Sequence, residues 1–223
     1  FSHSSNVGMS KLAYKAFGNN PEEFRKYLHN YHLDIKSPID LTDIPSPRLA
    51  PLDKKLAGSM NMVTMSFGYA IQISPLHTLT LYNAIANDGK MMKPYIVKRI
   101  EYANGKVETI RPTEIRQVIS KHTADTVAAM MVRVVDYSEG KRGQVPGYYI
   151  AGKTGTAQIA GPGGYTTETN HSFIGFGPVG NPKFVTLIRL EKPQRTYANI
   201  TAAPLFAEIT SYLLSHYHIP PER

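Results

Sequence analysis

Three strand-like runs in the C-terminal half, joined by short connections, constrain the fold most. They are rich in β-branched and aromatic residues, and they cover Tyr148 to Ile159, His171 to Phe176 and Lys183 to Leu190. The connections carry turn-forming residues at Gly161 to Gly164 and at Gly180 to Pro182. Because parallel strands need a long crossover between them, these connections predict an antiparallel sheet.

Residue patterns typical of helices stand before and after these three runs in the sequence. Ser120 is placed to cap a helix that runs through Val135, and a final apolar segment from Ala202 to His216 would lie across one face of the sheet. Earlier in the chain, capping residues and apolar spacing predict helices from Val7 to Phe17 and from Pro21 to about Leu33. The predicted fold class is therefore α+β, an antiparallel sheet flanked by helices.

The segment between these helices and the sheet is predicted to be more varied. Prolines at positions 38, 45, 47 and 51 predict a long ordered loop from Lys36 to Ala57. Ser74-Pro75 begins a largely buried helix that ends at Asp88-Gly89. Asn104-Gly105 predicts a hairpin whose strands are Tyr95 to Tyr102 and Lys106 to Ile110.

Composition excludes several kinds of site. The chain has no cysteine, which rules out disulfides, thiolate metal sites and cysteine nucleophiles. The net charge of +8 favours an anionic neighbour, but the basic residues are scattered, so nucleic acid is not expected as a partner. His29 and His32, like His216 and His218, lack the further ligands that a metal needs and are expected at the surface, so we expect neither a metal nor a cofactor.

The segment from Ala151 to Ala157 has two enzymatic interpretations. Together with Gly147, the residues Gly152-Lys153-Thr154 match the pattern of a P-loop, which binds nucleotide phosphates. A P-loop has to open directly into a helix, whose amides face the phosphates. Here the stretch from Gly155 to Gly164 contains five glycines or prolines, which argues against a helix.

The second interpretation places Lys153 to Thr156 on a strand at the edge of a cleft. Alternation then sends Lys153 and Gly155 to one face and Thr154 and Thr156 to the other. A Lys-Thr-Gly element accompanies a Ser-x-x-Lys nucleophile and a Ser-x-Asn element in penicillin-binding proteins and serine β-lactamases. Ser4-Ser5-Asn6 supplies a Ser-x-Asn, although the cap of the first helix explains that tripeptide equally well.

Along nearly its whole length the chain resembles the class B penicillin-binding proteins, nearest the division-type transpeptidase. Asn6 precedes Lys153 by 147 residues, in the motif order of the family. Ala70 and His77 depart from the family pattern, in which glycine and glutamine are usual. The resemblance is carried by Ser4 to Ala13, by Ser66 to Tyr69 with Ser74 to Leu76, and by Lys153 to Ala157.

This resemblance implies a partial penicillin-binding transpeptidase fold, similar to that of β-lactamases, and peptidoglycan D,D-transpeptidase activity through a serine acyl-enzyme. It assigns proton relay to Ser4, substrate orientation to Asn6 and a positive potential to Lys153. It also implies that the Thr156 amide is an oxyanion-hole donor. The substrate-binding residues that it implies are Ser5, Thr154, Gly155 and Thr156, and Tyr165 is a further candidate for substrate contact.

The family's nucleophile precedes its Ser-x-Asn element and would therefore lie before Phe1. Ser138-Glu139-Gly140-Lys141 has the right spacing, but it follows a helix, lies in a glycine-bearing turn and stands after Ser-x-Asn. We therefore expect residues 1–223 to be the C-terminal portion of one transpeptidase domain, inactive alone. The implied location is the outer, periplasmic face of the cytoplasmic membrane, with an anchor upstream.

The implied partners are peptidoglycan stem peptides, β-lactam antibiotics and, for the intact protein, division or elongation membrane proteins. Two alternatives remain open from the sequence. One is a non-catalytic β-lactam sensor or interaction module with the same fold. The other is a nucleotide-binding protein built on the P-loop pattern.

Overall fold

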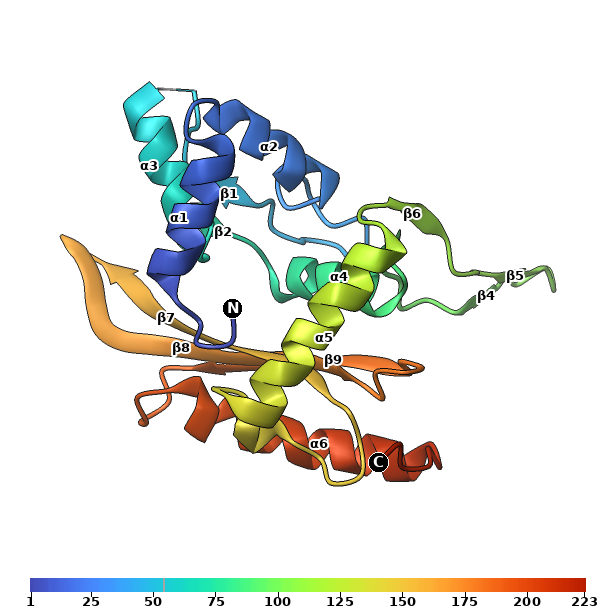
Figure 1. The fold of residues 1–223 in the computed structure, drawn as a ribbon. Helices are drawn as coiled ribbons and strands as arrows, with labels where there is room; N and C mark the ends of the chain where they lie inside the picture. Colours follow the sequence, from blue (N-terminus) through green and yellow to red (C-terminus); the bar gives the residue numbers. More distant parts are fainter. Residues whose placement is uncertain (54) are drawn as a thin grey trace.

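A three-stranded antiparallel sheet forms the middle of the molecule (Figure 1). The computed structural model describes residues 1–53 and 55–223. The strands are β7 (Ala151–Gly161), β8 (Gly164–Gly177) and β9 (Phe184–Glu191), in the order β7-β8-β9. The predicted sheet is confirmed, and β8 is longer than predicted because a tight turn pairs Gly161 with Gly164 and extends the β7–β8 hairpin.

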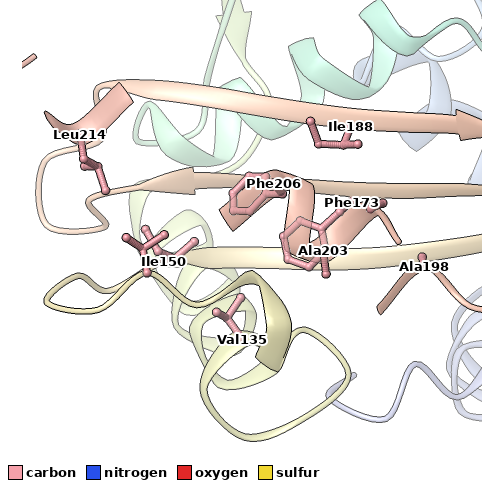
Figure 2. Close-up of a cluster of buried hydrophobic side chains, with 10 residues drawn as sticks. Val135, Ile150, Phe173, Ile188, Ala198, Ala203, Phe206 and Leu214 are labelled. Carbon is pink, nitrogen blue, oxygen red and sulfur yellow. The ribbon is translucent and has the colours of Figure 1, made fainter. Parts of the chain in front are cut away.

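Helix α6 (Ala202–His216) covers one face of the sheet, as predicted, and buries the main hydrophobic cluster there (Figures 1 and 2). The rings of Phe173 on β8 and Phe206 on α6 pack with centroids 4.6 Å apart, and neither side chain is exposed by more than 1%. Two short 3-10 helices, η1 (Lys141–Gly143) and η2 (Ala198–Ile200), adjoin this layer.

The opposite face of the sheet is covered by α4 (Pro75–Ala86) and α5 (Lys121–Tyr137) (Figure 1). Met131 of α5 packs there against side chains of β7 and β8 in a second buried cluster. Ser120 caps α5 as predicted, since its hydroxyl accepts a hydrogen bond from the Thr123 amide at 3.1 Å. Helices on both faces of an antiparallel sheet confirm the α+β class.

The N-terminal part is a helical layer built from α1 (Asn6–Phe17), α2 (Pro21–Asn30) and α3 (Lys55–Met65) (Figure 1). A separate hydrophobic cluster holds it together, and a two-stranded strip of β1 (Arg48–Leu49) and β2 (Ile71–Gln72) lies beside it. The buried members of that cluster are Leu28, Leu33, Leu52, Met62 and Met65.

Two predicted boundaries in this layer are wrong by more than one residue. Helix α2 ends at Asn30 rather than near Leu33, because His32 adopts a left-handed backbone with φ 54°. The predicted loop to Ala57 ends earlier, since α3 already includes Lys55. The last proline of that loop is Pro51, so nothing beyond it prevents a helix.

Two small sheets complete the chain, β3 (Lys90–Met92) with β6 (Glu114–Gln117), and the projecting hairpin of β4 (Arg99–Glu101) and β5 (Val107–Thr109) (Figure 1). The hairpin at Asn104-Gly105 is confirmed, but β4 is shorter than the predicted strand. The amides of Ile96 and Val97 donate to the Asp40 carboxylate, each at 2.8 Å, instead of joining a strand ladder.

The histidines differ in their surroundings. His29 is largely exposed and lies 3.1 Å from the Asp34 carboxylate, whereas His32 is half-buried, and both of its ring nitrogens are buried without a hydrogen-bond partner. Burial lowers the pKa of His32. Within residues 1–53 and 55–223, no three metal-ligating side chains gather, and no helix has the length and apolarity to cross a bilayer.

Candidate active site

The start of the chain and strand β7 meet through a direct contact between Ser4 and Lys153. The Lys153 ammonium donates a hydrogen bond to the Ser4 hydroxyl oxygen at 2.7 Å and another to the Thr154 carbonyl oxygen at 3.0 Å. The two side chains are 149 residues apart in the sequence. Two elements predicted to contribute to one cleft therefore lie side by side.

The backbone around Ser4 determines which hydroxyl faces the lysine. Ser5 is the N-cap of α1, since its hydroxyl accepts from the Gly8 amide at 3.0 Å. Ser4 stands one residue earlier in a left-handed conformation, with φ 50°, which costs a non-glycine residue about 1–3 kcal/mol. Asn6 is the first residue of α1, so this helix begins one residue before its predicted start, and the Asn6 side chain is exposed.

The C-terminus of α5 positions this opening segment from the other side. Ser138 caps the end of α5, and its hydroxyl donates to the Ser2 carbonyl oxygen at 2.7 Å. Ser138 also begins the Ser-x-x-Lys sequence that ends at Lys141, which lies in η1. Its hydroxyl therefore serves to hold the chain segment that carries Ser4.

Burial alters the acidity of Lys153. The side chain is half-buried, and loss of hydration lowers the pKa of its ammonium from the ordinary lysine value, while the nearby Glu139 carboxylate raises it in part. A less basic ammonium releases its proton more readily to the adjacent Ser4 oxygen as that hydroxyl gives up its own proton. The pair therefore has the composition and the contact that a proton relay requires.

Strand β7 is the edge of its sheet, because β8 pairs with it on one side only within the described part of the chain. The Gln158 amide points away from β8, since it donates to the Tyr69 hydroxyl at 3.1 Å. In a strand, every second residue directs its amide and carbonyl to the same side. The amides of Thr156 and Thr154 therefore also face the open edge.

Three of the four predicted substrate-binding residues, Thr154, Gly155 and Thr156, occupy consecutive positions on this edge, whereas Ser5 caps α1. Thr154 lies on the opposite strand face from Lys153, yet its hydroxyl oxygen is 3.5 Å from the ammonium, so the twisted strand brings both toward the edge. The Thr156 hydroxyl accepts from the Ala198 amide at 3.2 Å and keeps its own proton for donation. A Cβ on Gly155 would come within 2.5 Å of the Ser172 hydroxyl, so a larger residue here would require that hydroxyl to rotate away.

The same geometry contradicts the P-loop interpretation. Lys153 pairs with Ile174 in the middle of a strand ladder, and β7 continues to Gly161 without a helix. The segment that carries Lys153 thus does not open into a helix, as a P-loop must. The nucleotide-binding prediction is wrong.

A hollow of about 850 Å³ extends the site along β7. Its walls come from the segment between α3 and α4, from β1 and from all three strands of the sheet. Tyr69, Gln158, Tyr165 and Ser172 line it, together with the guanidinium-bearing Arg48 and Arg189. Arg48 could not be singled out from the sequence, because no motif surrounds it.

His171 is a second residue that carried no signal in the sequence beyond lying in a strand. It pairs across the sheet with Thr156 and is completely buried. Its ring nitrogens contact two hydroxyls, that of Thr169 at 2.9 Å and that of Thr201 at 2.8 Å. Burial lowers its pKa, and a backbone hydrogen bond with Thr196 partly opposes that shift.

Comparison with known proteins agrees with this geometry. Residues 1–211 match the family described as the penicillin binding protein transpeptidase domain. The chain is 35% identical over 234 residues to the penicillin-binding protein PbpB of Mycolicibacterium smegmatis, covering 99% of this chain and 35% of that protein. It is 30% identical over 226 residues to a probable peptidoglycan D,D-transpeptidase, PbpC, of Pseudomonas aeruginosa, covering 99% and 37%.

Solved structures give the same result. Penicillin-binding protein 3 of Mycobacterium tuberculosis in its apo form has a TM-score of 0.89 and 30% identity, over 100% of this chain and 52% of that one. The same protein complexed with aztreonam gives a TM-score of 0.88 at 30% identity, again over 100% and 52%. The chain spans about a third of the length of the curated relatives named here and about half of the solved chain.

Proposed function

The chain belongs to the penicillin-binding protein transpeptidase family, and from that membership we propose that the protein is a peptidoglycan D,D-transpeptidase. In the proposed reaction, a serine hydroxyl attacks the penultimate D-alanine carbonyl of a stem peptide and the terminal D-alanine leaves as an amine. An amine of a neighbouring strand then displaces the serine and forms the cross-link. The covalent intermediate replaces one difficult step by two easier ones.

The contact between Lys153 and Ser4 is the observation that carries this proposal. The Ser4 hydroxyl hands its proton to the departing amine, and the lysine ammonium, which already donates to the same oxygen, replaces that proton. Lys153 is half-buried and Ser4 is exposed, so the transfer takes place at the mouth of the site, where the departing amine can reach Ser4. Asn6, at the start of α1, orients the substrate amide.

Strand β7 supplies the remaining groups in this proposal. The Thr156 amide faces the open edge and stabilises the oxyanion of the tetrahedral intermediate, with the amide of the nucleophilic serine as its partner. The hydroxyls of Thr154 and Thr156 hold the terminal carboxylate of the stem peptide. Gly155 has no side chain to obstruct the ligand beside Ser172, and Ser5 fixes the turn that presents Ser4.

We place the nucleophile on a segment that precedes residue 1, with residues 1–223 as the C-terminal portion of one transpeptidase domain. The only Ser-x-x-Lys in the sequence runs from Ser138 to Lys141, and its serine hydroxyl is engaged by the Ser2 carbonyl. The share of each relative that the chain covers supports the same division.

The proposed ligands are stem peptides and β-lactam antibiotics, which acylate the same serine. Structures of the Mycobacterium tuberculosis protein complexed with aztreonam and with ampicillin support this for the family. We further propose that the intact protein works at the outer face of the cytoplasmic membrane, anchored upstream, beside membrane proteins of division or elongation.

Fluorescent penicillin tests the proposal directly. We expect the protein with its upstream segment to be labelled and residues 1–223 alone to remain unlabelled. Lys153→Ala should slow labelling by at least about 100-fold, the scale of losing one proton-transfer group. Lys183→Ala, at an exposed lysine before β9, is the matched control and should label normally.

Each result is informative. Labelling of residues 1–223 alone would overturn the upstream nucleophile. Absence of labelling in the longer protein would overturn acyl transfer altogether. Labelling without turnover of a stem peptide would instead identify a non-catalytic β-lactam sensor.

A further inference from the structure

One amide on the open edge of β7 already donates a hydrogen bond to another part of the protein. The Gln158 amide donates to the Tyr69 hydroxyl at 3.1 Å, across 89 residues of sequence. Two residues earlier, the Thr156 amide faces the same edge, away from β8. A peptide added to this edge could therefore accept a hydrogen bond from the Thr156 amide but not from the Gln158 amide.

The segment that carries Tyr69 is held rigidly. It follows α3 directly, and the amides of Gly68 and Tyr69 donate to the carbonyls of Met65 and Thr64 at 3.0 and 3.1 Å. Gly68 has a φ of 95° and Ala70 a φ of 56°, so the chain turns sharply on both sides of the tyrosine. A fixed backbone presents the phenol ring to β7 in one orientation.

Ring contacts fix the tyrosine further. The Tyr69 ring meets the Tyr165 ring edge-on, with centroids 4.9 Å apart and planes at 80°. It also packs against Phe67, at 5.6 Å between centroids. Because Tyr165 lies on β8 and Gln158 on β7, Tyr69 contacts both strands of the hairpin.

The ladder between β7 and β8 becomes irregular at the same point. Their register shifts between Gln158 and Ala160. A shift of this kind bends a strand and changes the direction of its edge groups. The hydroxyl of Tyr69 and the bend therefore both end the regular edge at Gln158.

We propose that Tyr69 determines substrate specificity by ending the peptide-binding edge of β7. This inference rests on the proposed function, in which an extended stem-type peptide lies along that edge. Peptides that add to a sheet edge pair with alternate residues of the edge strand. Such a peptide pairs at Thr154 and Thr156, but its next carbonyl finds the Gln158 amide occupied by the phenol.

The variant Tyr69→Phe tests this proposal, because it removes the hydroxyl and keeps the ring. It is made in the protein that includes the upstream segment. Two acyl-D-alanyl thioesters serve as probes, a short one with a benzoyl cap and one extended by two further residues at its N-terminus. Acylation rates are measured as a function of probe concentration.

We expect the half-saturating concentration of the extended probe to fall roughly three- to tenfold in Tyr69→Phe, since one freed amide gains a hydrogen bond. The short probe should be unaffected, and the maximal rates of both probes should be unchanged. Tyr212→Phe, which removes an exposed hydroxyl on α6, is the control and should leave both probes unchanged.

An unchanged ratio between the two probes in Tyr69→Phe would overturn the proposal. An equal loss for both probes, or a fall in their maximal rates, would also overturn it, because Tyr69 would then only support the strand. Failure of the proposed function is a separate result, since the unaltered protein would then react with neither probe.

Discussion

His171 shows how a titratable side chain can be built into a sheet as a neutral group. The Thr201 hydroxyl donates to the Tyr197 carbonyl oxygen at 3.3 Å, so it accepts from Nδ1–H of His171. Nε2 is then unprotonated and accepts from the Thr169 hydroxyl. A second proton on the ring would therefore require the Thr169 hydroxyl to rotate and accept from Nε2–H instead of donating to Nε2.

Stability should consequently fall in acid. Burial holds the pKa of His171 below its ordinary value of 6.5, so the unfolded chain binds the proton more tightly than the folded one. The free energy of unfolding should therefore decrease as the pH falls below about 6.5. The contribution of His171 to this decrease should end once the pH lies below the pKa of His171 in the folded protein. Urea unfolding between pH 4.5 and 8 measures the slope.

The variant His171→Asn isolates this residue. We expect it to lose about 1–3 kcal/mol at pH 8, because a threonine hydroxyl loses its buried partner. We also expect a smaller dependence on pH. His32, whose pKa burial also lowers, contributes a slope of the same sign, so His32→Asn is the comparison. Equal slopes in the unaltered protein and in His171→Asn would contradict the assignment.

At the scale of single residues, the sequence predicts short motifs but not the contacts between residues that are far apart in the chain. Ser4 and Lys153 could be named because each belongs to a short pattern with a known chemistry. The sequence could not predict that Ser4 contacts Lys153 while Ser5 caps α1, because this depends on a left-handed backbone at Ser4. Tyr69 was part of a predicted block, but its partner Gln158 lies 89 residues away.

Among the elements, α5 begins where the sequence predicts. Ser120 and Thr123 form the cap, and the helix runs to Tyr137, two residues beyond the prediction. Apolar spacing was a reliable guide here because one face of α5 packs on the sheet. Apolar spacing did not identify α3, which begins at Lys55, within the predicted proline-rich loop.

Removal of the α5 cap should destabilise the protein measurably. Ser120→Ala leaves the Thr123 amide without its partner and should cost about 1 kcal/mol of the free energy of unfolding. Ser120→Asp keeps an acceptor oxygen at the cap and should retain most of the stability. Chemical denaturation measures both. A similar loss in the two variants would show that packing of Ser120, and not capping, matters.

At the scale of the whole molecule, the last residues connect three parts of the fold. The Arg223 guanidinium donates to both carboxylate oxygens of Asp136 on α5, at 2.8 and 2.9 Å, and lies 4.5 Å from the centre of the Tyr149 ring. The Glu222 amide donates to the Gly147 carbonyl at 2.7 Å. The segment that leads into β7 is thereby held between α5 and the end of the chain.

This contact should contribute more to stability than an exposed ion pair. Asp136 has only 8% of its side chain exposed, so Arg223→Ala leaves a sheltered carboxylate unpaired and should cost about 1–2 kcal/mol. Lys26→Ala, which breaks the exposed pair with Glu23, should leave the thermal midpoint nearly unchanged. Equal shifts in the two midpoints would contradict this expectation.

The layer arrangement followed from the sequence, since short connections and capped helices predicted a sheet between helices. The lengths of the smaller strands did not, because acceptors such as the Asp40 carboxylate, far from them in the sequence, take their amides.

The hydrogen bond of the Ser138 hydroxyl connects two distant parts of the molecule. It joins the end of α5 to the Ser2 carbonyl, two residues before the serine that meets Lys153. Helix α5 has 17 residues and is about 25 Å long. At its far end Lys121 is paired with Asp88, beside the strands β3 and β6. The segment that carries Ser4 is therefore held by one end of a helix whose other end lies at the surface near β3 and β6.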